Sequence, residues 1–272
     1  NTTINRLMDE PTEIANIPSN YARIMGRELA LSIRELPQLL KFTQLTTEQL
    51  LQDDTQLTAS QLVQILQNSA GLSENADFGL RLGKRLTSTT HGPMGFLVNS
   101  SPNLLIALKA FKKFIPTRIS FACIHIEYTA SSVHVSLHFD IQLPAEVYRL
   151  LSETCAVILY ECAEFIVGPQ LDQARIHFTH QQPDYSQQYA HYLSGDYGFS
   201  APELKVEFPL SLCQIPNASA NHDTYMLAMR QCQSMLEQLK PAQQHYSYPI
   251  QKMMLTSSLQ ELSEDSIAAA LF

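Results

Sequence analysis

The spacing of apolar residues changes from a helical period to a period of two at Ile119, and this change constrains the fold more than any other feature. The segments ISFACIHIEY and VHVSLHFD alternate apolar and polar residues around the polar turn TASS, residues 129–132. This pattern is typical of an antiparallel β-hairpin. The turn sets a register that pairs apolar residues across the strands: Tyr128 with Val133, Ile126 with Val135, and Ile124 with Leu137. The apolar face needs a cover, which a helix predicted over 144–167 can supply.

The opposite face of the hairpin is polar and carries several of the chain's nine histidines. This face consists of Phe121, Cys123, His125, Glu127, His134, Ser136, His138 and Asp140. His134 and His138 would lie about 13 Å apart along an extended strand, too far to share one small ion. Cys123 opposite His138, with His125 diagonal to it, is the best metal-ligand geometry in the sequence. We interpret the face as a polar sheet surface or a ligand-lining wall and predict no metal.

The segments before the hairpin carry helix signals. Residues 19–36, SNYARIMGRELALSIREL, place apolar side chains on one helical stripe: Tyr21, Met25, Leu29, Ile33 and Leu36. Capping boxes over 46–49 and 58–61, each a threonine followed three residues later by a glutamine, predict two helix starts. The N-terminal part is therefore expected to be helical.

Four more segments complete the expected fold. Apolar periodicity predicts helices over 74–86 and 103–114, and short β-patterns over 174–180 and 203–208 predict two strands that extend the sheet. The predicted fold class is α+β: a helical N-terminal part plus a small antiparallel sheet covered by helices.

Composition excludes several classes of protein. A net charge of −8 argues against this chain coating nucleic acid or an anionic membrane. Five cysteines without Cys-x-x-Cys spacing argue against a disulfide framework or structural zinc and favour the cytoplasm. The most apolar segment, residues 155–168, carries Glu161 and Glu164 and is too short to cross a bilayer, so no membrane partner is predicted. Catalytic and nucleotide-binding motifs are absent from the sequence, so we predict a non-enzyme without a cofactor.

A seam of apolar residues runs along a helix predicted over 222–239. Its members are spaced 4, 3, 4 and 3 residues apart: Tyr225, Met229, Cys232, Leu236 and Leu239. Two interpretations stay open, a helix that packs on the core of its own chain and a seam that joins two copies in a dimer. Residues 240–249 are predicted to be a linker.

Three stretches together resemble a known family. These stretches, in order within residues 20–217, are DFGLRLGKRL, HGPMGFLVNSSPNLLIALKAFKKFIP and ARIHFTHQQPDYSQQYAHYLSGDYGFSAPELKVEFPLSLCQIPN. They resemble the arabinose-binding-type N-terminal domain of AraC/XylS-family transcription regulators, in its ornithine- and virulence-regulator-like form. His91 and Pro93 depart from the usual pattern of the family, which could alter the local shape of a pocket.

The last residues fit the same resemblance. LQELSEDSIAAALF resembles the beginning of the family's helix-turn-helix domain, with Ile267, Ala268 and Leu271 packing inward. The recognition helix would follow this sequence, and without it the chain is not expected to bind an operator specifically. The resemblance divides the chain into an effector-sensing domain over 1–217, a dimerisation and linker segment over 218–248, and the start of a DNA-binding domain over 249–272.

The function implied by the resemblance is that of a cytoplasmic bacterial transcription regulator that responds to a ligand. Its partners would be a small-molecule effector, promoter DNA through the DNA-binding domain, and a second copy in a homodimer, with RNA polymerase as a further candidate. The effector is expected between helices 103–114 and 144–167 and the hairpin, near Phe96, Phe121, His125, Tyr128 and Tyr160. The alternative is a stand-alone small-molecule-binding or adaptor protein without DNA-binding activity.

Overall fold

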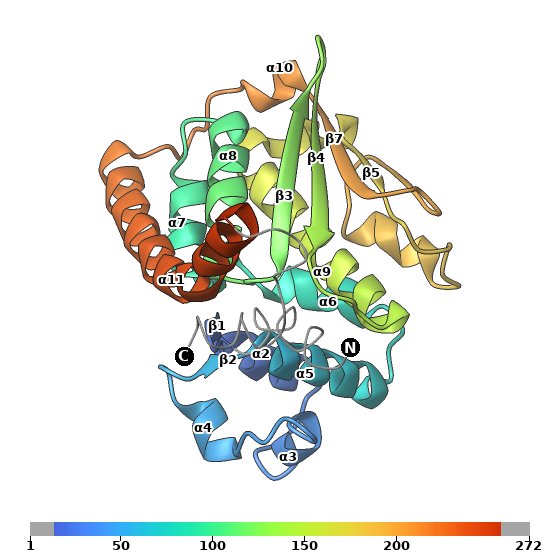
Figure 1. Ribbon diagram of the computed structural model, residues 1–272. Coiled ribbons are helices and arrows are strands. Elements are labelled where there is room, and N and C mark those ends of the chain that lie inside the picture. Colours follow the sequence, from blue (N-terminus) through green and yellow to red (C-terminus); the bar gives the residue numbers. More distant parts are fainter. Residues whose placement is uncertain (1–13, 257–272) are drawn as a thin grey trace.

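The computed structural model describes residues 14–256, with side chains from 14 to 239 except that of Gln170. The main sheet has five strands, and Figure 1 shows it standing above a group of N-terminal helices. The strands are β3 (Ala122–Tyr128), β4 (Ser132–Phe139), β5 (Arg175–His177), β6 (Asp196–Gly198) and β7 (Leu204–Pro209), in the order β3-β4-β7-β5-β6. The predicted α+β class is confirmed.

The register of the hairpin is as predicted from its turn. Tyr128 pairs with Val133, and the pairing continues down to Ala122 opposite Phe139. β7 pairs with β4 and β5 in antiparallel fashion, so both strands predicted in the second half of the chain join the sheet. The segment between these two strands contains a 3-10 helix, η5 (Ser186–His191).

A long helix, α9 (Ala145–Val167), covers the apolar face of the sheet and joins two hydrophobic cores. The sheet-side core lies between the sheet, α7 (Pro93–Asn99), α8 (Leu104–Phe114) and the second half of α9, and contains Phe111, Val135 and Val206. The helical core lies among the N-terminal helices and the first half of α9, and contains Tyr21, Leu62 and Leu82. Because α9 contributes to both cores, a movement of this helix would affect both.

The N-terminal helices are α2 (Asn20–Glu28), α3 (Leu36–Leu39), α4 (Thr47–Leu51), α5 (Ala59–Leu72) and α6 (Phe78–Arg85). Both predicted capping boxes form: Thr46 and Gln49 exchange side chain–backbone hydrogen bonds at the start of α4, and Thr58 and Gln61 do so at α5. A short pair of strands, β1 (Ile17–Pro18) and β2 (Gln56–Leu57), ties the first described residues to the loop before α5.

The prediction of a single helix over 19–36 is wrong. α2 ends at Glu28, and the Ala30 and Leu31 amides donate to the Arg27 and Gly26 carbonyls, both at 3.0 Å. These bonds form a Schellman motif in which Ala30 has a φ of 54°. Glycine usually occupies that position, and its absence hides the helix end in the sequence. Ile33, assigned to the apolar stripe, is 67% exposed.

Two glycines allow α6 to lie unusually close to α9. A Cβ at Gly83 would lie 2.6 Å from Val157 Cβ and 2.8 Å from the Thr154 carbonyl oxygen. A Cβ at Gly79 would meet Glu153 and the Leu150 carbonyl in the same way. The Thr154 hydroxyl also donates to the Gly79 carbonyl at 3.0 Å, which fixes the two helices relative to each other.

The C-terminal helix, α11 (His222–Thr256), runs beside α7 at the left of Figure 1. It is helical through residues 240–249, where a linker was predicted. The division into three domains stays a prediction. Ile267, Ala268 and Leu271, assigned to the helix-turn-helix, lie outside the described residues.

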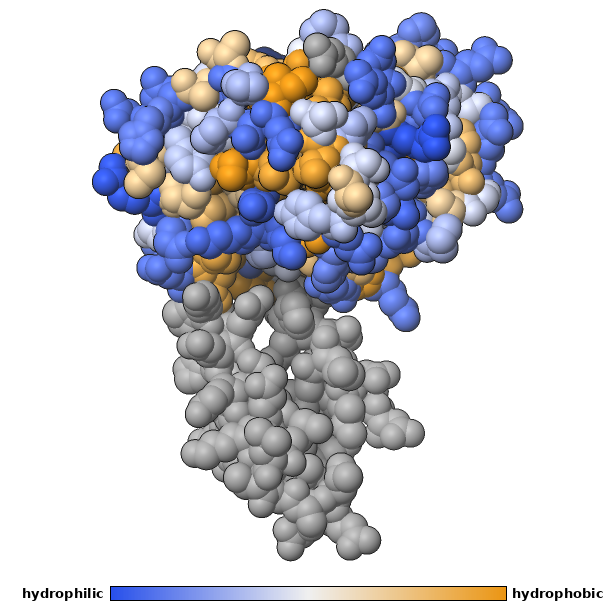
Figure 2. Space-filling model, turned by 90° about the horizontal axis from the view of Figure 1, so that it is seen from above, coloured by the Kyte–Doolittle hydropathy of each residue, from blue (hydrophilic) through white to orange (hydrophobic). Residues whose placement is uncertain are grey.

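Hydrophilic residues cover most of the face shown in Figure 2, with apolar residues gathered in patches between them. Within residues 14–256, none of the helices combines the length and apolar character needed to cross a membrane.

Candidate ligand-binding cavity

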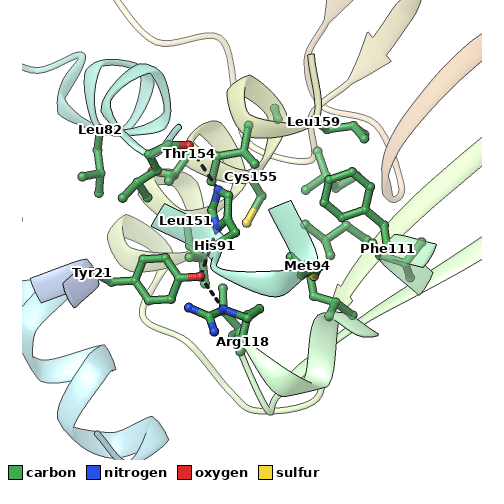
Figure 3. A pocket seen from close by; sticks show the side chains of 18 of the residues that line it. Tyr21, Leu82, His91, Met94, Phe111, Arg118, Leu151, Thr154, Cys155 and Leu159 are labelled. Atoms are coloured by element: carbon green, nitrogen blue, oxygen red, sulfur yellow. Dashed lines mark hydrogen bonds between the residues drawn. The ribbon is translucent and has the colours of Figure 1, made fainter. Parts of the chain in front are cut away.

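A cavity of about 90 Å³ lies where the two cores meet, between the sheet, α9 and the N-terminal helices. Its volume is several times the roughly 10–15 Å³ that one water molecule needs. Apolar side chains from both cores form nearly all of its wall (Figure 3). They include Met25, Leu62, Leu66, Leu82, Leu86, Met94, Phe111, Ile115, Ile124, Val135, Leu137, Leu151, Ile158, Leu159, Ile176, Leu204 and Val206.

Three polar side chains among the residues that line this cavity form a hydrogen-bonded chain. Arg118 Nε donates to the Tyr21 hydroxyl at 3.1 Å, and that hydroxyl lies 3.0 Å from His91 Nδ1. His91 Nε2 lies 3.1 Å from the Leu86 carbonyl oxygen. Because a carbonyl can only accept, Nε2 carries the imidazole proton, and Nδ1 accepts the proton of the Tyr21 hydroxyl. Figure 3 shows the three side chains meeting beside Met94 and Leu151.

Two of these groups are neutral at physiological pH, and the third is charged. Burial lowers the pKa of His91 to about 4, and the Arg118 charge adds to this effect. Burial raises the pKa of Tyr21, although Arg118 opposes the rise. Arg118 is 6% exposed, and its guanidinium has no carboxylate within 4.0 Å among the side chains that the structure describes. This hydrogen-bonded group of side chains therefore carries one buried positive charge.

The backbone around Gly92 brings His91 to the cavity. The 3-10 turn η2 (Ser88–His91) ends at Gly92, whose φ of 57° suits glycine and lets the chain turn directly into α7. Gly95 then lies against the Ser88 carbonyl, where a Cβ would be only 1.8 Å from the oxygen. His91, noted in the sequence as a departure from the family pattern, thus becomes part of the cavity wall.

The cavity borders the region predicted for the ligand but also extends among the N-terminal helices, and the five residues predicted to bind the ligand do not line it. Phe96 and Tyr128 are 48% and 52% exposed, and His125 is also exposed. Phe121 and Tyr160 are buried in the helical and sheet-side cores. A ligand-binding role for these five residues stays a prediction.

Sequence reasoning missed Tyr21 and Arg118 because they are 97 positions apart and belong to no local motif. Tyr21 was placed on an apolar stripe, and Arg118 stood alone after the helix predicted over 103–114. A lone arginine in a predicted loop carries no signal of burial.

The predicted polar face of the hairpin is only partly confirmed, because Phe121 is buried in the helical core and Ser136 is also buried. The His125 and His138 rings pack edge to face with centroids 5.1 Å apart, and Cys123 Sγ lies 3.8 Å from His125 Nε2. In the part of the chain that the structure describes, no three histidine, cysteine, aspartate or glutamate side chains are grouped so as to hold a metal ion.

A second buried ionisable group lies on α9 near the cavity. Glu153 is 1% exposed and accepts hydrogen bonds from the Tyr185 hydroxyl at 2.6 Å and the Tyr189 hydroxyl at 2.5 Å. Burial raises the pKa of Glu153 to about 7, against the opposing effect of the two tyrosine hydrogen bonds. This carboxyl group faces the aromatic cluster beside β5 and β6 and does not line the cavity.

The predicted seam on α11 lies against its own chain. Cys232 is buried in the sheet-side core, and Tyr225, Met229 and Leu236 pack against that core from partly exposed positions. Leu239 is half-buried. Arg118 is close enough to Cys232 to oppose the rise of the thiol pKa, which burial brings to about 11. A dimerisation role for these five residues stays a prediction.

Comparison with known proteins identifies the family. Residues 35–217 match the family described as the arabinose-binding N-terminal domain of AraC transcription regulators. The chain belongs to this family. The matched region contains the cavity-lining residues from Leu62 onwards, including His91 and Arg118. Most of the cavity wall therefore belongs to the domain that defines this family.

Two similar proteins are named as regulators. The ornithine utilization regulator of Pseudomonas aeruginosa is 27% identical over 177 residues, which cover 65% of this chain and 52% of that protein. The chain thus spans about half the length of this curated relative. The crystal structure of the transcriptional regulator CdpR from Pseudomonas aeruginosa superposes with a TM-score of 0.58 at 16% identity, over 92% of this chain and 74% of that chain. At this identity the likeness concerns the fold.

Proposed function

We propose that this chain is the effector-sensing portion of a ligand-responsive transcription regulator and that a small-molecule effector binds in the cavity. The observation that carries the proposal is an apolar cavity, with the hydrogen-bonded side chains of Tyr21, His91 and Arg118 beside it, inside a domain of this family. Such a combination is typical of small-molecule sites, in which apolar walls supply contact area and polar groups fix orientation.

The position of α11 supports a route from the cavity to the rest of a regulator. α11 packs against α7 and against the turn η3 (Ile115–Thr117). His91 lies two residues before the start of α7, and Arg118 directly follows η3. These two cavity-lining residues are therefore next in sequence to the two segments against which α11 packs.

An effector can change activity only if it binds one arrangement of the protein more tightly than another, and coupling of about 1–3 kcal/mol is ordinary. A ligand that contacts His91 and Arg118 differently in two positions of α11 would meet this condition. α11 would then transmit the change to the DNA-binding domain implied by the family. Promoter DNA, a second copy in a homodimer and RNA polymerase are the proposed partners of the whole regulator.

A thermal-shift screen of bacterial metabolites tests the effector proposal. A ligand at 100 times its Kd should stabilise the chain by about 2.7 kcal/mol, which corresponds to about 5–10 °C for a protein of this size. Leu159→Trp would fill the cavity and should abolish the shift. Phe165→Trp is the matched control, because Phe165 is half exposed on the same helix and does not line the cavity. Equal shifts in the two variants would contradict binding in the cavity.

A further inference from the structure

Three of the polar side chains that line the cavity make their hydrogen bonds within the protein. Arg118 Nε donates to the Tyr21 hydroxyl at 3.1 Å, and that hydroxyl donates to His91 Nδ1 at 3.0 Å. His91 Nε2 donates to the Leu86 carbonyl oxygen at 3.1 Å. The hydroxyl proton and both imidazole nitrogens are thus in use. A ligand could gain a hydrogen bond from Tyr21 or His91 only by breaking one that already exists.

The charged end of Arg118 lies against the backbone that leads into α7. Its Nη2 lies 3.4 Å from the Thr90 carbonyl oxygen, and a Cβ placed on Gly92 would lie 3.5 Å from Nη1 and 3.9 Å from Cζ. The guanidinium carbon also lies 5.6 Å from the centre of the Tyr21 ring, within the range of a cation–π contact. The neighbours of this head group are therefore parts of the protein itself.

The other two polar side chains of the wall belong to α9. The Thr154 hydroxyl donates to the Gly79 and Leu150 carbonyl oxygens at 3.0 and 2.8 Å. Burial raises the pKa of the Cys155 thiol to about 12, so the thiol stays neutral, and a buried thiol packs as a small apolar group. Neither side chain offers a ligand a charge or a free hydroxyl proton.

We propose that the effector of this cavity is an uncharged, apolar molecule no larger than toluene, held by van der Waals contact and by the removal of apolar surface from water. The proposal rests on the proposed function and names the chemical class of the effector. A polar or charged ligand would lose its hydration without gaining partners in the wall, which is unfavourable. An apolar ligand gives up no hydrogen bond, and it supplies the dispersion contacts that side chains around a void lack.

The volume of the cavity limits the size of this molecule. A cavity of about 150 Å³ lined by leucine, isoleucine and phenylalanine is known to bind benzene and xenon. The cavity of this protein is smaller, at about 90 Å³, but Met25 and Met94 line it, and unbranched methionine side chains adapt readily to a guest. We therefore expect xenon to fit without rearrangement and toluene to fit once these methionines change conformation.

Apolar contacts alone can couple such a ligand to α11. Met94 lies in α7 and Ile115 begins η3, and both side chains line the cavity. α11 packs against α7 and η3. A ligand that packs better against Met94 and Ile115 in one position of α11 than in another would shift the balance between the two positions. This coupling requires no hydrogen bond from the ligand to His91 or Arg118.

Probes that differ in one small group test the chemical class. Toluene, phenol and benzoate are titrated against the unmodified chain at neutral pH by calorimetry and thermal shift, and xenon binding is followed by xenon NMR. Phenol carries a hydroxyl where toluene carries a methyl group of similar size. We expect toluene to bind at least about fivefold more tightly than phenol, the lower end of the cost of burying a hydroxyl without a partner. Benzoate should give no measurable shift.

Two substitutions of Leu159 change the cavity in opposite directions. Leu159→Trp adds bulk to the wall and should abolish the binding of toluene and xenon, whereas Leu159→Ala widens the cavity and should bind toluene at least as tightly as the unmodified chain. Phe165→Trp, on the same helix but outside the wall, should bind toluene like the unmodified chain. A general loss of folding cannot produce this pattern, because the widened variant keeps its binding.

Three outcomes would overturn the apolar class. Phenol or benzoate that binds as tightly as toluene would do so, as would a charged metabolite whose thermal shift is lost in Leu159→Trp and kept in Phe165→Trp. Both results would leave the cavity as an effector site. Toluene and xenon binding that persists in Leu159→Trp would place these probes outside the cavity. If no probe and no metabolite binds in a manner sensitive to Leu159→Trp, the proposed effector function fails as well.

Discussion

Gly83→Ala is the sharpest test of the close packing between α6 and α9. The added Cβ would lie 2.6 Å from Val157 Cβ and 2.8 Å from the Thr154 carbonyl oxygen. Both distances are much shorter than a normal van der Waals contact. The nearest groups are the Cβ of a β-branched residue and a backbone carbonyl, and neither can rotate away. One of the two helices must therefore shift.

The size of the effect follows from two opposing contributions. Overpacking a well-filled interface typically costs about 1–3 kcal/mol. Replacing glycine by alanine inside a helix would otherwise stabilise the fold by about 0.5–1 kcal/mol. The net loss in the free energy of unfolding should be about 1–2 kcal/mol, which lowers Tm by about 2–8 °C at the sensitivity expected for this chain length.

Gly71→Ala provides the matched control. Gly71 lies in the last turn of α5, and an added Cβ would meet nothing within 4 Å. This substitution should leave stability unchanged or raise it by up to about 1 kcal/mol. Urea and thermal unfolding, followed by circular dichroism, would measure both variants. If Gly83→Ala proved as stable as Gly71→Ala, the inferred contact between α6 and α9 would be refuted.

The remaining predictions concern two buried ionisable groups and one helix cap. Because the pKa of folded His91 is about 4 against an ordinary 6.5, the unfolded chain takes up the proton first as pH falls. The free energy of unfolding should therefore fall as the pH drops from 6.5 toward 4, by up to about 1.4 kcal/mol per pH unit. Urea unfolding measured over this pH range should show the decrease in the unmodified chain but not in His91→Gln. Glu153 acts in the opposite direction, because its pKa is about 7 in the folded chain and ordinarily 4.5. The stability it contributes below pH 4.5 should be lost as the pH rises to 7, and Glu153→Gln should abolish this loss. A variant whose pH profile matched that of the unmodified chain would contradict the assignment for that residue. Thr58→Ala should lower the free energy of unfolding by about 1 kcal/mol, since it removes the hydroxyl that accepts from the Gln61 amide, whereas Thr58→Ser should retain most of it. Equal stability of these two variants would show that the cap contributes little.

Some features of this protein were determined by neighbouring residues and could be predicted from them. The register from Tyr128–Val133 to Ile124–Leu137 follows from a short turn and a period of two, because a shift by one residue would expose the whole apolar face. The capping boxes at Thr46 and Thr58 are equally local, since both partners lie within one helical turn. Local patterns also gave the family resemblance.

Other features depended on residues far apart in the chain. α2 ends in a Schellman motif with alanine in place of glycine, so the helix end left no mark in the residue types. The seam on α11 had two interpretations in the sequence, and the folded chain buries Cys232 in its own core. Periodicity identifies which side of a helix is apolar, but it does not identify the surface that covers this side.

The cavity itself was decided by the tertiary structure. The sequence pointed to the region between the hairpin and its covering helix. The residues predicted there were chosen mainly because they are aromatic, and the sequence does not reveal which way their side chains point. Tyr21, His91 and Arg118 come from three separate segments and meet only when the helical core packs on α9 and the sheet. Burial of the Arg118 charge is a property of that packing, because the same arginine in an exposed loop would be fully hydrated.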